Sequence, residues 1–167
     1  MPEHATSQVS RTESGVWTPR IVGFLCYWCS YTGADGAGTA RMKYPANVDI
    51  VRLMCSGRCD PELITTAFAN GADGVMVLGC HIGDCHYIAG NHKTMARMPL
   101  VRRILTDLGI EQERFRHEWV SAAEGEKFTR IVTEMTEEVR KLGPLNWPKL
   151  MHERGVGHGF DLKPWGD

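Results

Sequence analysis

The chain has little excess charge of either sign and no long apolar run, and each absence excludes a class of protein. Its 167 residues include 19 lysines and arginines and 20 aspartates and glutamates. Proteins that bind nucleic acid through its phosphates usually carry a basic excess, so we expect no nucleic-acid partner. No apolar run approaches the ~20 residues that a membrane-spanning helix needs, so we expect a soluble protein with no membrane partner.

The amino terminus lacks the charged-then-apolar pattern of a secretory signal. Residues 1–19 are polar and aperiodic, and we interpret them as a polar tail. A protein without a secretory signal is expected in the cytoplasm. Cysteine pairs in that compartment more often hold a metal or perform redox chemistry than form structural disulfides.

Short apolar runs alternate with helical patterns along the rest of the chain. Strands are predicted at 21–25, 48–54, 74–78 and 115–120, and helices at about 61–71, 91–109 and 121–143. The glycines of the segment 33–38 favour an irregular loop, followed by a short helix from about Thr39 that ends before Pro45. Strands that alternate with helices predict a small three-layer α/β domain with a mostly parallel sheet, over residues 20–144.

Residues 145–167 show no regular period and are predicted to form a carboxyl-terminal extension. The segment contains three aromatic residues, Trp147, Phe160 and Trp165. Aromatic anchors in irregular segments often mark contacts with a partner, so the extension is expected to pack on its own domain or on another protein.

The six cysteines all follow strand-like runs. They form the pairs Cys26 and Cys29, Cys55 and Cys59, and Cys80 and Cys85, the last of which lies in the sequence GCHIGDC. Functional groups of an open parallel sheet collect beyond the carboxyl ends of its strands. The pattern therefore predicts that the thiols lie together at the carboxyl edge of the sheet.

Three chemistries fit such a group of thiols. An iron-sulfur cluster needs four thiolates from tight loops, with backbone amides directed at the sulfurs, and a structural zinc site needs four thiolates as well. The third is thiol-disulfide exchange by Cys26 and Cys29, but the predicted glycine-rich loop after them offers no helix N-terminus to activate a thiol. A Rieske centre is not favoured, since the spacing of His81 and His86 from the neighbouring cysteines does not match; we expect both histidines outside the ligand set.

Four segments resemble the delta subunit of methyl-viologen-reducing hydrogenase. They are GFLCYWCSYTGADGAG, VRLMCSGRCDP, NGADGVMVLGCHIGDCHYIAGN and RFRHEWVSAAEGEKF, and the resemblance runs from about Ile21 to Gly143. It implies an electron-transfer protein of anaerobes, methanogens among them, that relays electrons through a 2Fe-2S cluster. The implied partners are a hydrogenase or formate dehydrogenase on one side and the A-type flavoprotein subunit of a heterodisulfide reductase on the other.

The family's cysteine pattern falls on Cys26, Cys29, Cys55, Cys80 and Cys85, of which four would hold the cluster. Cys59 stands where the family usually has an apolar residue, so the resemblance gives it no ligand role.

No catalytic group of another kind is evident. The segment 33–38 lacks the G-K-S/T sequence of a phosphate loop and is interpreted as a loop around the metal site. We find no nucleophile with a nearby base, so the chain is expected to be a non-catalytic subunit of an oxidoreductase complex.

Overall fold

A parallel sheet of four strands forms the centre of the fold. The computed structural model describes residues 17–145 and residue 147. The strands are β1 (Ile21–Cys26), β2 (Val48–Leu53), β3 (Gly74–Gly79) and β4 (Phe115–Trp119). They lie in the order β2-β1-β3-β4 and every neighbouring pair is parallel, which confirms the predicted α/β fold.

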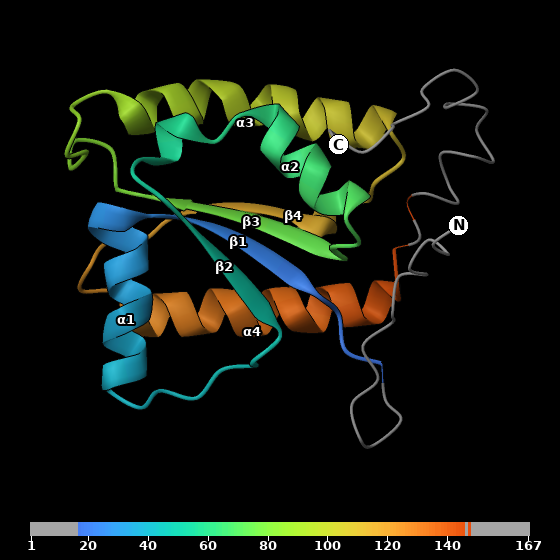
Figure 1. Cartoon of the computed structure of the whole chain (residues 1–167), viewed down its shortest axis with the longest axis horizontal. Helices are drawn as coiled ribbons and strands as arrows, with labels where there is room; N and C mark the ends of the chain where they lie inside the picture. Colours follow the sequence, from blue (N-terminus) through green and yellow to red (C-terminus); the bar gives the residue numbers. More distant parts are fainter. Residues whose placement is uncertain (1–16, 146, 148–167) are drawn as a thin grey trace, which may run out of the picture.

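Helices cover both faces of this sheet and make three layers (Figure 1). The helices α2 (Pro61–Ala69) and α3 (Gly90–Asp107) lie on one face, and α1 (Thr32–Thr39) and α4 (Gly125–Leu142) lie on the other. The described residues also contain three short helical segments: η1 (Tyr27–Tyr31), a π-helix, and the 3-10 helices η2 (Ser56–Arg58) and η3 (Gln112–Arg114). None of the described helices is long and apolar enough to cross a membrane.

Each face of the sheet has its own hydrophobic core. Residues of β3 alternate between the two: Val75 and Val77 pack with α2 and α3, while Met76 and Leu78 pack with α1 and α4. All six residues of β3 are buried, as expected for a strand covered on both faces. β3 and β1 are therefore the rigid centre from which the cysteine-bearing segments leave.

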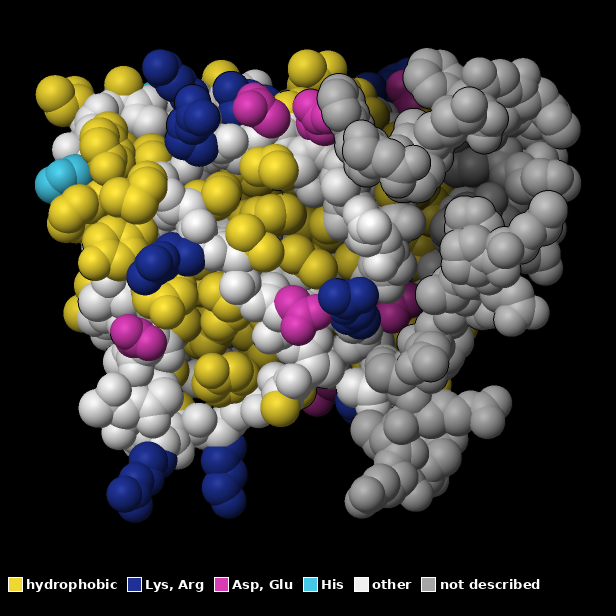
Figure 2. Space-filling view, viewed as in Figure 1, with side chains coloured by type: hydrophobic (Ala, Val, Ile, Leu, Met, Phe, Trp, Pro, Cys, Tyr) yellow, Lys and Arg dark blue, Asp and Glu magenta, His cyan; other side chains and the backbone are white. Residues whose placement is uncertain are grey.

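The edge strand β2 is much less covered. Ile50 and Val51 are exposed. Figure 2 shows hydrophobic side chains gathered over the centre of the face that β2 crosses in Figure 1.

The glycine-rich segment 33–38 is a helix, so the prediction of an irregular loop there is wrong. η1 and α1 follow β1 without interruption and end at Thr39, where the short helix was expected to begin. Packing accounts for the glycines: a side chain at Gly33 would lie 2.8 Å from the backbone oxygen of Ser121, and one at Gly125 would lie 3.2 Å from the backbone nitrogen of Ala37. The close approach of α1 to the start of α4 thus outweighs the low helix propensity of glycine.

The last helix begins four residues later than predicted. α4 starts at Gly125 and not at residue 121, and the backbone N–H of Ser121 donates to the Glu124 carboxylate at 2.7 Å. The Glu124 carboxylate also contacts His81 at 2.6 Å. It thereby joins the helix start to the cysteine loop.

The first residues after the predicted domain boundary pack on the domain. The backbone N–H of Leu145 donates to Asp73 at 2.9 Å, and Trp147 is buried in the core beside α2 and α3. Phe160 and Trp165 lie outside the described residues, and the division of the chain at residue 144 stays a prediction.

Candidate metal centre

Three buried cysteines meet at the carboxyl ends of the two central strands. Cys26 is the last residue of β1, Cys29 lies in η1, and Cys80 follows β3. The Cys29 and Cys80 sulfurs are 2.9 Å apart, and those of Cys26 and Cys80 are 3.6 Å apart. All three sulfurs lie within 4.8 Å of one another, which is the spacing of groups that can share a metal centre. We call these residues the central trio.

Ser30 ties the central trio to the sheet. Its hydroxyl accepts a hydrogen bond from the backbone N–H of Cys26 at 2.9 Å and donates one to the carbonyl of Leu78 at 2.7 Å. Ser30 is fully buried and joins the end of β1 to the end of β3. Its place right after Cys29 is the only signal that the sequence offers for this role, which we did not predict.

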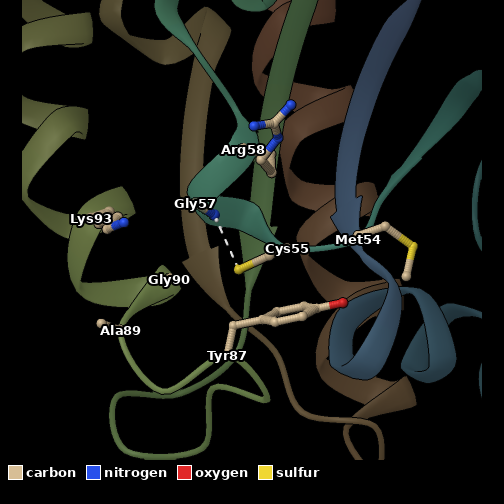
Figure 3. Close-up of a pocket in the computed structure, with 8 residues that line it drawn as sticks. All are labelled: Met54, Cys55, Gly57, Arg58, Tyr87, Ala89, Gly90 and Lys93. Atoms are coloured by element: carbon tan, nitrogen blue, oxygen red, sulfur yellow. Dashed lines mark hydrogen bonds between the residues drawn. The ribbon is translucent and has the colours of Figure 1, made fainter.

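A second group consists of Cys55 and Cys85, whose sulfurs are 3.9 Å apart. Cys55 follows the edge strand β2 and accepts a hydrogen bond from the backbone N–H of Gly57 at 3.4 Å (Figure 3). Cys85 lies in the loop that joins β3 to α3. We call these two residues the outer pair.

The first residue of α3 holds the outer pair together. A side chain at Gly90 would overlap the Cys55 sulfur and lie 3.1 Å from the Cys85 sulfur. Only glycine lets the helix start come so close to both sulfurs. The 18-residue helix directs the partial positive charge of its N-terminus at this spot, which favours thiolates there.

The pKa shifts of the trio agree with a shared negative charge. A hydrogen bond from the Cys29 thiol, against the effect of burial, lowers the pKa of Cys26 to about 5. The same hydrogen bond and burial raise the pKa of Cys29, and burial raises the pKa of Cys80 to about 11. Without a cation between them, the three thiols can hold one charge but not three.

In the outer pair, backbone amides favour the charged form of one member. Burial opposes ionisation of the Cys85 thiol, but hydrogen bonds from the backbone at Asn91, Tyr87 and Gly90 together lower its pKa. The pKa of Cys55 is raised by burial, and the hydrogen bond from Gly57 only partly offsets this effect. Of the two thiols, Cys85 therefore ionises more readily to a thiolate.

Cys59 lies away from both groups, so the prediction that the thiols lie together is wrong for this cysteine. It is fully buried in the core beside α2 and α3, with Phe24, Ile64 and Phe68 in the same cluster. Burial among apolar side chains raises the pKa of its thiol to about 12. A thiol so hard to ionise in an apolar site behaves as a small hydrophobic side chain.

The two histidines next to the cysteines make other contacts. His81 pairs with Glu124, and the ring of His86 stacks on Trp28 with the ring centroids 3.8 Å apart. The side-chain amide of Asn91 donates to the carbonyl of His81 at 2.6 Å and to that of Cys80 at 3.4 Å. The fully buried Asn91 thus fixes the loop from inside, a role that its sequence position alone did not reveal.

The structure brings all five candidate ligands to one edge of the sheet, as two neighbouring groups. Cys26 and Cys29 are followed by helix and not by a loop, so the objection to thiol-disulfide exchange on that ground is wrong. The third thiol argues against a site in which Cys26 and Cys29 act alone, because the Cys80 sulfur lies 2.9 Å from that of Cys29.

The donor set fits an iron-sulfur cluster. It consists of buried sulfurs, with backbone amides directed at both sulfurs of the outer pair. A side chain in place of Gly90 would fill the space beside that pair. These are features by which proteins hold and tune iron-sulfur clusters. Sulfur donors alone also fit zinc.

Comparisons with known proteins match nearly all of the described chain. The family model described as methyl-viologen-reducing hydrogenase, delta subunit, covers residues 21–143. The vhc iron-sulfur subunit of an F420-non-reducing hydrogenase from Methanococcus voltae is 52% identical over 128 residues, which are 77% of this chain and 89% of that protein. The iron-sulfur subunit of an F420-non-reducing hydrogenase from Archaeoglobus profundus is 52% identical over 133 residues, or 80% and 97% of the two chains.

A third relative carries the same domain inside a longer chain. The A subunit of the ferredoxin:CoB-CoM heterodisulfide reductase from Methanosarcina mazei is 45% identical over 127 residues. The match covers 76% of this chain but only 16% of that protein.

Proposed function

Since the chain belongs to the family of methyl-viologen-reducing hydrogenase delta subunits, we propose that it is the electron-transfer subunit of a hydrogenase- and heterodisulfide-reductase-linked complex, with a 2Fe-2S cluster as its cofactor. The observation that carries the proposal is the convergence of five buried thiols at one sheet edge. When bound, such a cluster supplies a site that takes up and gives away one electron.

The central trio and one member of the outer pair are the proposed ligands. The trio, Cys26, Cys29 and Cys80, already has the spacing of a shared centre. We assign the fourth position to Cys85, because the backbone amides of the α3 start favour its thiolate. Cys55 is then the fifth thiol, which accepts the N–H of Gly57 and lines the space beside the centre.

Other residues of this edge orient the ligands and exclude water. Ser30 holds Cys26 against β3, and Asn91 holds the backbone of Cys80 and His81. Tyr27 and Trp28 pack against each other beside the trio, with ring centroids 5.1 Å apart, and Arg52 lies over the ring of Tyr27. Removal of water raises the energetic effect of every nearby amide and cation on a buried charge.

The proposed partners are a hydrogenase or formate dehydrogenase as electron donor and the A-type flavoprotein subunit of a heterodisulfide reductase as acceptor. Support for the acceptor comes from the Methanosarcina mazei relative, in which a domain like this chain is part of the A-type polypeptide itself. A domain fused to its electron acceptor in one protein can serve the same acceptor as a separate chain in another. We propose a cytoplasmic complex.

Two alternatives keep the same residues. A zinc ion could hold the four thiolates and make the chain an assembly module without electron transfer, or Cys26 and Cys29 could exchange thiols and disulfides. The test is reduction of the anaerobically purified protein with dithionite, followed by addition of the oxidised A-type flavoprotein. Bleaching of a visible absorption band and subsequent reduction of the flavin support the proposal; a colourless protein that passes no electrons to the flavin contradicts it.

A further inference from the structure

A cavity of about 380 Å³ opens at the surface directly beside the outer pair. Cys55 and Gly90 line its inner wall, next to the sulfurs, and the side chains of Met54 and Tyr87 also line it (Figure 3). Met54 is 54% exposed and Tyr87 is 48% exposed. The cavity therefore connects the outer pair to an exposed apolar surface.

The apolar surface continues around the mouth of this cavity. Ile88 follows Tyr87, is 86% exposed, and has a positive backbone φ of 68°, a strained conformation for a β-branched residue. The loop thus holds a large apolar side chain out in solvent at a conformational cost. Exposed apolar groups that adjoin one another, with a polar rim, are typical of protein contact sites.

The rim of the cavity is positively charged. Arg58 and Lys93 line it from η2 and α3, and no carboxylate is among the described residues that line it. Within the described part of the chain neither cation forms a salt bridge, whereas Arg97, one turn further along α3, pairs with Asp60. The N-terminal end of α3 adds positive potential at the same place.

We propose that this cavity and its rim are the docking site for the A-type flavoprotein subunit, which would insert an apolar side chain into the cavity and place carboxylates against Arg58 and Lys93. The inference rests on the proposed function and adds the surface through which the electron leaves. An acidic rim is the chemistry that complements these two cations, and an apolar side chain fits walls made by Met54 and Tyr87. A partner seated here touches the wall that contains Cys55, whose sulfur lies 3.9 Å from that of the proposed ligand Cys85. Docking therefore brings the partner beside the proposed cluster.

The test measures, at low and high salt, how tightly the cluster-loaded protein binds the purified A-type flavoprotein. The variant Arg58→Glu/Lys93→Glu reverses the rim. The matched control, Arg41→Glu/Lys43→Glu, makes the same charge change at two exposed cations after α1, in the layer opposite α3 (Figure 1). Met54→Ala tests the apolar wall without any change of charge.

We expect the rim variant to bind about tenfold more weakly at low salt, mainly through slower association, and the difference to shrink at high salt because ions screen the contact. Met54→Ala should weaken binding at both salt concentrations, and the control should bind like the wild type. Iron content and the visible spectrum should be the same in all four proteins.

Two results would overturn the docking site: unchanged binding of the rim variant, or an equal loss in the control. Either can occur while the wild type still reduces the flavin, so a failure here is distinct from a failure of the proposed function. The latter would appear as a wild type that carries no reducible centre at all.

Discussion

The central trio and the outer pair occupy the same edge of the sheet but are built in different ways. The trio stands on β1 and β3, which are paired with neighbours on both sides and buried on both faces. The outer pair stands on the end of the edge strand β2 and on a loop, and its spacing depends on the first turn of α3. The sheet thus fixes the positions of the trio, whereas the close approach of the α3 backbone to the sulfurs fixes those of the outer pair.

The surroundings of the two groups differ in the same sense. A serine and an asparagine that are both fully buried hold the trio, whereas the pair borders an open cavity with exposed aromatic and aliphatic side chains. The buried hydrogen bonds around the trio suit residues that hold a cluster in place. The open cavity suits contact with a partner, and Cys55 of the outer pair lines its wall.

The largest effect is expected when the trio is broken. Cys80→Ser removes the sulfur that lies 2.9 Å from that of Cys29 and 3.6 Å from that of Cys26, and a serine oxygen is a poor ligand for iron held among sulfurs. We expect iron per chain to fall below about a tenth of the wild-type value, because the cluster then lacks one of its four protein ligands. The paramagnetic signal of the reduced protein should vanish with it.

The control for this change is Cys59→Ser. It lies in the apolar core away from both groups, so iron content should stay as in the wild type. The free energy of unfolding should fall by about 1–3 kcal/mol, because a buried hydroxyl there replaces a thiol in an apolar site. Loss of iron in this variant would show that the ligand set is wrong.

The next comparison is within the outer pair. Cys85→Ser should remove most of the iron, since Cys85 is the proposed fourth ligand, while Cys55→Ser should leave most of it in place. Iron and paramagnetic signal per chain measure both. The reverse ranking would make Cys55 the ligand and would limit the α3 amides to a tuning role.

A smaller effect is expected from the glycine that supports the pair. In Gly90→Ala the new methyl group overlaps the Cys55 sulfur, so the helix start must move away from the loop. We expect a loss of about 1–3 kcal/mol in the free energy of unfolding together with weaker iron retention on dilution into chelator. Gly38→Ala is the matched control: nothing among the described residues lies near its added methyl group, and it should be neutral or slightly stabilising.

The smallest effect is expected from the histidines. His81→Ala removes the contact with Glu124, and His86→Ala removes the ring stacked on Trp28. Both variants should keep wild-type iron, with at most a shifted reduction potential, because groups outside the ligand set tune a cluster without holding it. If either histidine change strips iron as fully as Cys80→Ser, the centre has histidine ligation.

The sheet and the edge at which the cysteines meet were predictable because each rests on a local pattern. The apolar runs predicted every strand, with the last residue off by one, and strand ends of a parallel sheet must share an edge. The helix at 32–39 was not predictable, because its glycines pack against the backbone of Ser121 and Ala122, which lie far along the chain. The roles of Ser30, Gly90 and Asn91 rest on such long-range contacts too.

The division of five thiols into a trio and a pair also needed the structure. Spacing along the chain groups Cys26 with Cys29 and Cys80 with Cys85, but in space Cys80 joins the first pair and Cys85 meets Cys55. The reason is the central position of β1 next to β3.

The most direct test of the proposed cluster is the content of iron, acid-labile sulfide and zinc in the protein purified without oxygen. We predict two irons and two sulfides per chain, no stoichiometric zinc, and a paramagnetic signal that appears on reduction. One zinc per chain with neither iron nor sulfide would contradict the cluster and would make this edge of the sheet a structural site.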